Sequence, residues 1–410
     1  MPNRLKTICL IVHGMTEHNR RLQPWRYVHE VARQLSLHGH QVTIVSDGQD
    51  YLPSEELLHG VRVLRVASVR NFHWKPNRQL QSVVQQIRPD HILWNVGLTS
   101  FLHQQLWLGD DMPVVGVFTS PIYTSRDMSR LGLGRITSGY RLSAVHLAGA
   151  FLPRTMLRRS LSGGRLKQLV VQTSATRQSL LQGGLLGKSI TLIPPGVDPA
   201  WQAAGHDVAC EMRAVLGYKA ADHVVLYFGS PAPLRGLHTL LRALKIARQE
   251  DPSLKLVILN RRRADELLRE DADLRRLLSD TEISTYVNVV SGFLDEEHLV
   301  RNVAACDIVA LPFELVPSDA PLSLLEAQAL GKPVVTTNLV CLPELVAHGP
   351  HYLATPSSDN SLARELVRAA RDLSTQSGNA RVSSKQDLPW AQTRSWEQVG
   401  EEWMHFIDSL

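Results

Sequence analysis

The chain has 410 residues, more than one hydrophobic core usually holds, so two domains are expected. Hydrophobic residues make up 44% of the chain and charged residues 20%, which is typical of an ordered soluble protein. No apolar run reaches the roughly 20 residues that a membrane-spanning helix needs, so we do not expect a transmembrane protein.

The charge is distributed unevenly. The net charge is +5, but residues 1–195 carry 23 Lys and Arg against 10 Asp and Glu, and the rest of the chain is net acidic. Residues 128–197 contain no acidic residue and ten basic ones, which suits an anionic partner. Their apolar residues fit either an anionic membrane surface or the core face of a helix. No nucleic-acid motif accompanies the charge, so nucleic acid is not expected.

Four cysteines lie far apart, without a CxxC or a Cys/His ligand spacing. This usage predicts a reducing, cytoplasmic location. The basic segment leaves a peripheral position at the inner face of a membrane open.

The first half alternates strand-like runs with helical patterns. Between the runs at 7–12 and 41–46, apolar residues recur at helical spacing, so this segment is expected to pack one face on a sheet. Further strand-like runs follow at 61–66, 91–96, 113–118 and 168–173. The alternation predicts a parallel βαβ layout.

The second half repeats this style, with a helix at 237–249 and strand-like runs at 224–229, 254–259, 287–292, 307–312 and 333–337. The stretch 192–201 contains prolines and a glycine and is the best linker candidate. We therefore expect an α/β protein of two Rossmann-like domains with an interdomain cleft. The predicted units are 1–195, 196–385, and a C-terminal helix in 386–410 that packs back on the first domain.

Two loops of the second half carry candidate site residues, because ligands of open parallel sheets bind beyond the carboxyl ends of strands. Arg235 precedes a helix after Gly229, where a cation beside free N–H groups suits phosphate, although Arg235 alone could equally solvate a turn. A second helix begins near Leu322 and Ser323 and contains Glu326. Taken alone, Glu326 is better explained as part of an S-x-x-E capping box with Ser323.

These loops, in their order and with their flanks, resemble the GT-B glycosyltransferases of family 4, which are retaining and use nucleotide sugars. The resemblance covers nearly the whole chain. It rests on GHQVTIVS, HGVRVLRV, RPDHILWNVG, LIPPGVD, FGSPAPLRG, VVSGFLDEEHLVRNVAACDIVALP, LSLLEAQALGKPVVTT and SWEQV. It implies a donor held mostly by the C-terminal domain and an acceptor held mostly by the N-terminal one.

The resemblance also implies roles for single residues at the donor. Glu326 matches the second glutamate of the E-x7-E motif, which holds the ribose hydroxyls. Arg235 matches the lysine at the diphosphate. The other expected donor-binding residues are Gly14, Gly229, Gly292, Phe293, Leu294, Leu322 and Ser323. His13 and His18 flank Gly14, and an acceptor-side role for one of them stays open, although surface histidines are commoner.

Three positions depart from the family pattern. Ser318 stands where the first glutamate would contact the transferred sugar, and Asp319 is our candidate substitute, with Glu314 as an alternative. Ser230 stands where a diphosphate arginine is common, and Thr119 where a catalytic-site histidine is common. The candidate catalytic residues are Asp319, Ser318 and Thr119. The departing phosphate can itself take the acceptor's proton, so a dedicated base is not compulsory.

The expected function is that of a family 4-like hexosyltransferase, which moves a sugar from a nucleoside diphosphate sugar to an acceptor hydroxyl with retention. The acceptor would be a glycan, a lipid-linked molecule or a small molecule, in cell-surface glycan or glycolipid assembly. No cofactor and no metal are expected, since arginine and helix dipole replace a cation. A non-catalytic nucleotide-sugar-binding subunit is the alternative. The family markers disfavour a nucleotide-sugar 2-epimerase, which shares the fold.

Overall fold

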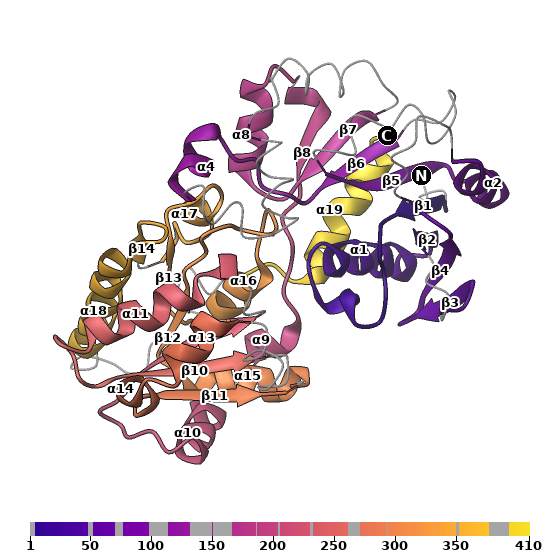
Figure 1. Ribbon diagram of the computed structural model, residues 1–410. Helices are drawn as coiled ribbons and strands as arrows, with labels where there is room; N and C mark the ends of the chain where they lie inside the picture. The colour runs from indigo at the N-terminus through magenta and orange to yellow at the C-terminus, as the bar shows by residue number, and fades with distance from the viewer. Residues whose placement is uncertain are drawn as a thin grey trace.

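Two parallel sheets, one in each half of the chain, organise the molecule (Figure 1). The structure is a computed structural model and describes residues 5–47, 52–69, 77–97, 114–131, 150, 166–185, 187–203, 206–229, 233–260, 271–292, 294–349, 352–376 and 393–410. The predicted α/β fold of two Rossmann-like units is confirmed. The exact bounds of the predicted domains stay a prediction, although the described sheets fall on either side of the expected linker.

The N-terminal sheet has eight strands in the order β3-β4-β2-β1-β5-β6-β7-β8. All neighbours pair in parallel except β3 and β4, which pair antiparallel. The strands are β1 (Thr7–Ile11), β2 (Gln41–Asp47), β3 (Glu55–Leu58), β4 (Val61–Val66), β5 (His91–Val96), β6 (Val114–Phe118), β7 (Leu166–Val171) and β8 (Ile190–Leu192). Its helical elements are η1 (Asn19–Arg21), α1 (Trp25–Leu37), α2 (Arg78–Ile87), α4 (Ser125–Leu131), α8 (Ser174–Gln182) and η3 (Gly187–Ser189).

The C-terminal sheet has six strands, all parallel, in the order β11-β10-β9-β12-β13-β14. They are β9 (His223–Gly229), β10 (Leu254–Asn260), β11 (Val287–Ser291), β12 (Ile308–Leu311), β13 (Val334–Thr337) and β14 (Tyr352–Ala354). The helical elements are α9 (Pro199–Ala203), α10 (His206–Val215), η4 (Pro233–Arg235), α11 (Leu237–Ala247), α13 (Ala272–Leu278), α14 (Thr281–Ser284), α15 (Glu296–Ala305), α16 (Leu322–Ala329), α17 (Leu342–Leu345), α18 (Asp359–Gln376) and α19 (Trp396–Asp408).

Each sheet has a hydrophobic core on both faces, which explains why its strands read as continuous apolar runs. In β1, Ile8 and Leu10 belong to one core, whereas Cys9 and Ile11 belong to the core on the opposite face. This alternation is the two-residue period of a strand. Within the described residues, no helix combines the length and the apolar character needed to cross a bilayer.

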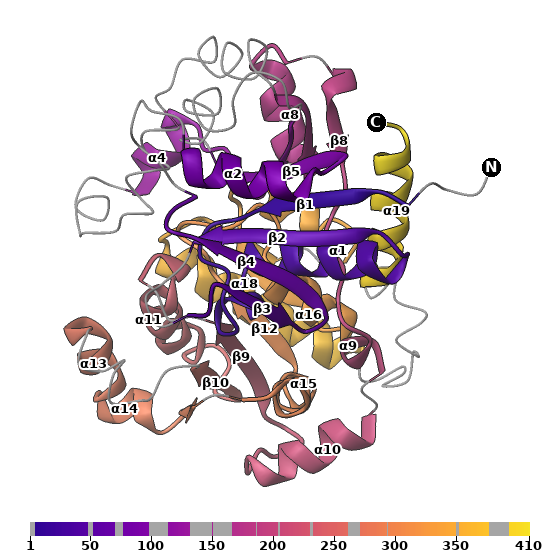
Figure 2. The ribbon, with the colours of Figure 1, turned by 90° about the vertical axis from the view of Figure 1, so that its right-hand side faces the viewer.

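The last helix, α19, returns to the N-terminal half and packs beside α1 (Figures 1 and 2). Trp403 belongs to the same core as β1 and α1, and its indole N–H donates to the hydroxyl of Tyr27 at 3.1 Å. Gly400 lies so close to α1 that an added Cβ would be 2.7 Å from Cβ of Gln34. The chain therefore crosses between the two sheets twice, at the linker and before α19.

Candidate functional site

The carboxyl ends of the two sheets face each other at a junction of loops. Thr119 follows β6, and its carbonyl accepts the backbone N–H of Asp319, in the loop after β12, at 2.7 Å. Nearby, the hydroxyl of Tyr123 accepts the N–H of Val316 at 2.5 Å and donates to its carbonyl at 3.1 Å. Ligands of open parallel sheets bind at such carboxyl ends, so this junction is the place to look for a site.

One cavity at this junction holds several of the predicted donor residues. The cavity, which we call the Glu326 cavity, has a volume of about 120 Å³. Leu294, Leu322 and Glu326 contribute to it from the C-terminal half, whereas Gly14, Gly229, Arg235, Gly292 and Ser323 do not line it. Its remaining lining residues are Arg20, Arg21, Arg26, Asp198, Trp201, Glu296 and Leu299.

The lining of the Glu326 cavity is strongly charged. Arg26 reaches from α1 across to Asp198 at 2.5 Å and to Glu30 on its own helix at 3.2 Å. Burial, together with the nearby Asp198 carboxylate, raises the pKa of Glu296 above its usual range. Sequence reasoning did not single out these charged residues, although the adjacent Arg20 and Arg21 in the loop after β1 were a usable signal.

Helix α16 carries Glu326 toward this cavity. The N-cap of α16 is Pro321, with no side-chain cap hydrogen bond, so Ser323 lies inside the first turn. The capping-box explanation of Glu326 is therefore wrong, because that motif needs the serine at the N-cap. The first N–H groups of the helix, at Leu322 and Ser323, have no intrahelical partner and point out of its N-terminus. They are available in principle to an anion.

Gly229 and Arg235 are brought together at the end of β9. An added Cβ on Gly229, whose φ is 121°, would lie 2.6 Å from Nη1 of Arg235. The guanidinium also lies over the ring of Phe313, 5.8 Å from its centroid. Gly236 has φ 77° and passes so close to the carbonyl of Pro312 that a Cβ would lie 1.9 Å away. Only glycine fits at Gly236, and it fixes the entrance of α11 against the loop after β12.

Gly14 lies on the other side of the junction, in the N-terminal half. It has φ 67°, and its carbonyl accepts the side-chain N–H of Asn19 at 2.8 Å. Leu322 of α16 packs against the core cluster that contains residues on both sides of Gly14. Gly14 itself does not line the Glu326 cavity. Gly292 follows β11 with φ 121°, whereas Phe293 and Ser230 lie outside the described residues.

A second contact between the halves, which we call the α8 contact, consists of Gln172, Thr173, Thr176, Asp319 and Glu344. Oδ1 of Asp319 accepts the hydroxyls of Thr173 and Thr176 at 2.7 and 2.6 Å, and Oδ2 accepts the N–H of Gln172 at 3.2 Å. Asp319 has no exposed surface. Its predicted contact with the transferred sugar stays a prediction that this geometry does not support, because the carboxylate is directed at α8.

The other two candidate catalytic residues are also buried in the α8 contact region. Ser318 is 4% exposed and Thr119 is 4% exposed. The hydroxyl of Thr119 accepts the side-chain N–H of Asn95 at 3.0 Å. Glu314, the alternative acid, accepts the hydroxyl of Thr239 on α11 at 2.6 Å. Catalytic roles for these residues therefore remain predictions.

The electrostatics of the α8 contact centre on Asp319. Burial raises the pKa of Asp319 to about 6, although three hydrogen bonds to its carboxylate oppose the shift. Glu344, from α17, accepts the N–H groups of Ser174 and Ala175 at 2.8 and 2.7 Å, where the N-terminus of a helix favours negative charge. Glu344 was not predicted as a site residue, because no local pattern marks it as a partner of α8.

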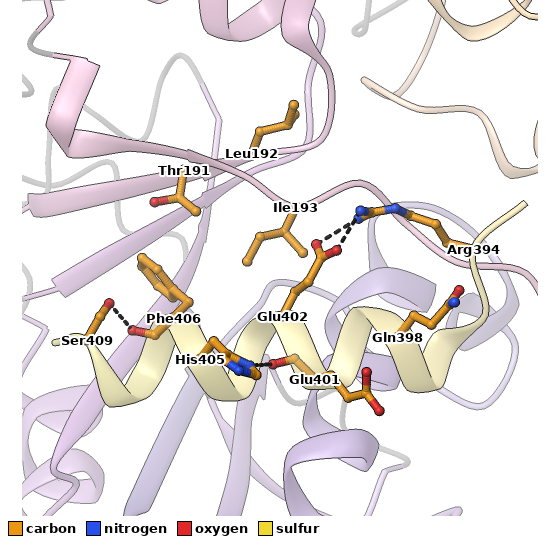
Figure 3. A pocket seen from close by; sticks show the side chains of 10 residues that line it. All are labelled: Thr191, Leu192, Ile193, Arg394, Gln398, Glu401, Glu402, His405, Phe406 and Ser409. Atoms are coloured by element: carbon orange, nitrogen blue, oxygen red, sulfur yellow. Dashed lines mark hydrogen bonds and ion pairs between the residues drawn. The ribbon is translucent and has the colours of Figure 1, made fainter.

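A larger groove of about 850 Å³ runs between α19 and the end of β8 (Figure 3). Arg394 pairs there with Glu402 at 2.5 Å, and His405 bonds to the carbonyl of Glu401 at 2.8 Å. None of the predicted site residues lines this groove. We favour the smaller Glu326 cavity as the site because residues of both halves line it and three predicted residues of the C-terminal half, Leu294, Leu322 and Glu326, are among them.

About half of the basic segment 128–197 falls outside the described residues, namely 132–149, 151–165 and 186. The expected anionic membrane surface therefore stays untested. Within the described residues, no group of three or more His, Cys, Asp or Glu side chains is arranged to hold a metal ion.

Two family profiles match this chain. Residues 25–201 match glycosyltransferase family 4, and residues 222–372 match the glycosyl transferases group 1. The D-inositol 3-phosphate glycosyltransferase of Rhodococcus jostii is 27% identical over 237 residues, which is 57% of this chain and 50% of the relative. The enzyme of the same name from Corynebacterium urealyticum is 29% identical over 248 residues, 59% of this chain and 56% of the relative. The chain thus spans about half the length of these relatives.

Solved structures resemble the whole chain in fold. HepE from Anabaena, in complex with UDP and glucose, has a TM-score of 0.67 at 17% identity and covers 99% of this chain and 100% of its own. The sucrose-phosphate synthase of Thermosynechococcus elongatus has a TM-score of 0.69 at 18% identity, with 98% of each chain covered. At such identities the likeness establishes the fold alone.

Proposed function

We propose that this chain, which belongs to the family 4-like glycosyltransferases of the GT-B fold, moves a sugar from a nucleoside diphosphate sugar to an acceptor hydroxyl with retention. The observation that carries this proposal is the Glu326 cavity, because it gathers Leu294, Leu322 and Glu326 at the junction of the two sheets. These are residues expected at the nucleobase, at the diphosphate and at the ribose.

The chemistry of the lining supports a nucleotide sugar. A carboxylate such as Glu326 can accept both hydroxyls of a ribose diol. The N-terminus of α16 offers N–H groups and a positive dipole end to the diphosphate, and Arg235, which does not line the cavity, adds a full charge after the neighbouring strand β9. These groups stabilise the charge that develops on the leaving diphosphate, which is usually the largest electrostatic contribution to such a transfer.

The names of related proteins suggest the first substrates to try. HepE was solved with UDP and glucose, so UDP-glucose is the first donor to test. D-inositol 3-phosphate, named for the relatives, is the first acceptor, and its phosphate suits the positive charge of the N-terminal half. A hexose as the transferred sugar, a part in cell-surface glycan or glycolipid assembly, and a cytoplasmic site at the inner membrane face are finer parts of this proposal.

Thermal shift with UDP, ADP, GDP and their sugars tests the donor site. A ligand that binds the folded chain raises the melting temperature, and Glu326→Ala should lower its affinity about 10-fold or more by removing a charge-assisted hydrogen bond. Glu326→Gln should lose less, because the amide keeps one acceptor oxygen. Glu297→Ala, at an exposed carboxylate on α15, is the matched control. If the ligand raises the melting temperature of Glu326→Ala as much as that of the wild type, Glu326 does not bind the ribose.

The alternative, a nucleotide-sugar-binding subunit without turnover, draws on one observation. Asp319 and Ser318 are both buried at the α8 contact. Neither the position of the family's first glutamate, Ser318, nor its neighbour Asp319 therefore directs a carboxylate toward the cavity. Release of UDP from UDP-glucose, followed over time with and without D-inositol 3-phosphate, separates the two functions. Binding without release would favour the subunit.

A further inference from the structure

The Glu326 cavity has room for one part of a nucleotide sugar. Its volume is about 120 Å³, whereas pockets that enclose whole small molecules usually measure about 300–1,000 Å³. Glu326, which we assign to the ribose, shares the wall with the apolar side chains of Leu294, Leu299 and Trp201. Apolar walls with a few polar groups suit the flat ring of a base. The polar groups of this wall should then decide which base fits.

Two carboxylates of the cavity lie against each other. Asp198, in the linker, has the guanidinium of Arg26 at 2.5 Å. Glu296 is the first residue of α15, two positions after Leu294, and its side chain contacts Asp198. Burial, followed by the charge of Asp198, raises the pKa of Glu296. Two carboxylates in contact supply acceptors but no donors, so N–H groups of a ligand would stabilise the ionised form of Glu296.

Arg20 lines the same cavity from the N-terminal half and has a donor to spare. Its side chain is 8% exposed, and its Nη2 donates to Glu17 at 3.0 Å and lies 2.8 Å from Nε2 of His59. Its Nε is buried and has no acceptor in the part of the chain that the structure describes. A buried N–H without an acceptor is costly, so the oxygen of a ligand at this wall would be stabilised.

The Watson–Crick edges of the four bases differ in the order of their donors and acceptors. Guanine presents the acceptor O6 followed by two donors, N1–H and the 2-amino group. Uracil presents one donor between two acceptors, and adenine and cytosine each present one donor beside an acceptor nitrogen. An ionised carboxylate only accepts, so it can receive both donors of guanine but meets an acceptor beside the donor of every other base. An arginine is the usual partner of O6.

We propose that the Glu326 cavity selects guanine, with Glu296 accepting N1–H and the 2-amino group and Arg20 donating to O6, so that the donor is a guanosine diphosphate sugar. This inference rests on the proposed function, because it names the base of the same donor. Asp198, paired with Arg26, acts as the positioning residue of Glu296. HepE, which was solved with UDP, shares only the fold with this chain at 17% identity and leaves the base open.

Isothermal titration calorimetry of the whole chain with GDP, UDP, ADP, CDP and inosine diphosphate tests the base. GDP should bind at least about 10-fold more tightly than UDP, ADP and CDP. Inosine diphosphate lacks only the 2-amino group and should bind about 10-fold more weakly than GDP. The 6-thio analogue of GDP, whose sulfur is a weak acceptor, should also bind more weakly. Binding of UDP as tight as that of GDP would overturn the proposal, and an unweakened analogue would remove the contact that it probes.

The variant Glu296→Gln removes the charge at nearly constant size. It should weaken the binding of GDP about 10-fold or more and leave that of UDP unchanged, so that the preference is lost. Glu297→Gln is the matched control, because Glu297 is the next residue and its exposed carboxylate pairs with Arg301 at 2.7 Å. This control should keep the full preference for GDP. A Glu296→Gln variant that keeps it as well would overturn the role of Glu296.

The same titrations separate this proposal from the proposed function. If Glu326→Ala weakens the binding of every nucleotide while the wild type binds GDP and UDP alike, the donor site stands and the selection of guanine is wrong. If the wild type binds none of the five nucleoside diphosphates, the proposed function itself is overturned.

Discussion

The two contacts between the halves of this molecule use similar residues in opposite ways. In the α8 contact, Asp319 is fully buried and both of its oxygens accept hydrogen bonds from the N-terminal half. Around the Glu326 cavity, Arg26 and Asp198 are charged, partly exposed and arranged around open space. One contact is closed and the other leaves room for a ligand.

The α8 contact is suited to hold the two halves together, and the Glu326 cavity is suited to bind a ligand. Buried polar groups with satisfied hydrogen bonds fix one arrangement, and removing one partner leaves the others unpaired at high cost. Partly exposed charges around a cavity contribute little to stability but set a field that attracts a charged ligand. We therefore expect substitutions in the α8 contact to change the free energy of unfolding, and those in the cavity to change affinity.

The largest expected effect comes from Asp319→Ala. It leaves the hydroxyls of Thr173 and Thr176 and the N–H of Gln172 without their acceptor, which should lower the free energy of unfolding by about 2–4 kcal/mol. Urea unfolding at neutral pH measures this. Asp319→Asn should lose less than about 1 kcal/mol, because the amide oxygen and turned hydroxyls restore most of the bonds. An alanine variant as stable as the wild type would show that this contact does not hold the halves.

The second effect is a pH dependence with a defined sign. Burial raises the pKa of Asp319 to about 6, so the protonated form is favoured in the folded state. Its stabilising contribution is complete below the unfolded pKa of about 3.9 and is lost as the pH rises through about 6. Between about pH 4 and pH 7 the loss should be about 2 kcal/mol. The difference in unfolding free energy between Asp319→Asn and the wild type isolates it, and a constant difference would contradict it.

The smallest effect is expected at Glu344, at the half-buried rim of the α8 contact. Glu344→Ala removes the acceptor of the Ser174 and Ala175 N–H groups and should cost about 1 kcal/mol, as for the loss of a helix cap. Water can replace the carboxylate at this half-buried place, so the effect stays below that of Asp319. In the same unfolding experiment, the free energy of unfolding of Glu344→Gln should lie between those of the wild type and Glu344→Ala. If Glu344→Ala loses as much free energy of unfolding as Asp319→Ala, the rim and the centre of the α8 contact do not differ in their contribution.

Local patterns carried the prediction of the architecture. The strand-like runs at 224–229 and 254–259 became β9 and β10, and the helical spacing of Trp25 to Leu35 became most of α1. These features depend on alternation within a few residues, which the sequence displays directly. The motif around Glu326 likewise predicted a helix that begins near Leu322 and contains a carboxylate, and both are present in the fold.

The sequence by itself determined most of the strands and the order in which the loops follow them, because each depends on neighbours along the chain, but it did not predict the short edge strands β3, β8 and β14. Only the tertiary structure decided that Asp319 faces α8 and that His13, but not His18, has an aspartate partner. These pairs join residues 34 to 146 positions apart. Their geometry follows from strand order and from the approach of the two sheets, neither of which any local pattern encodes.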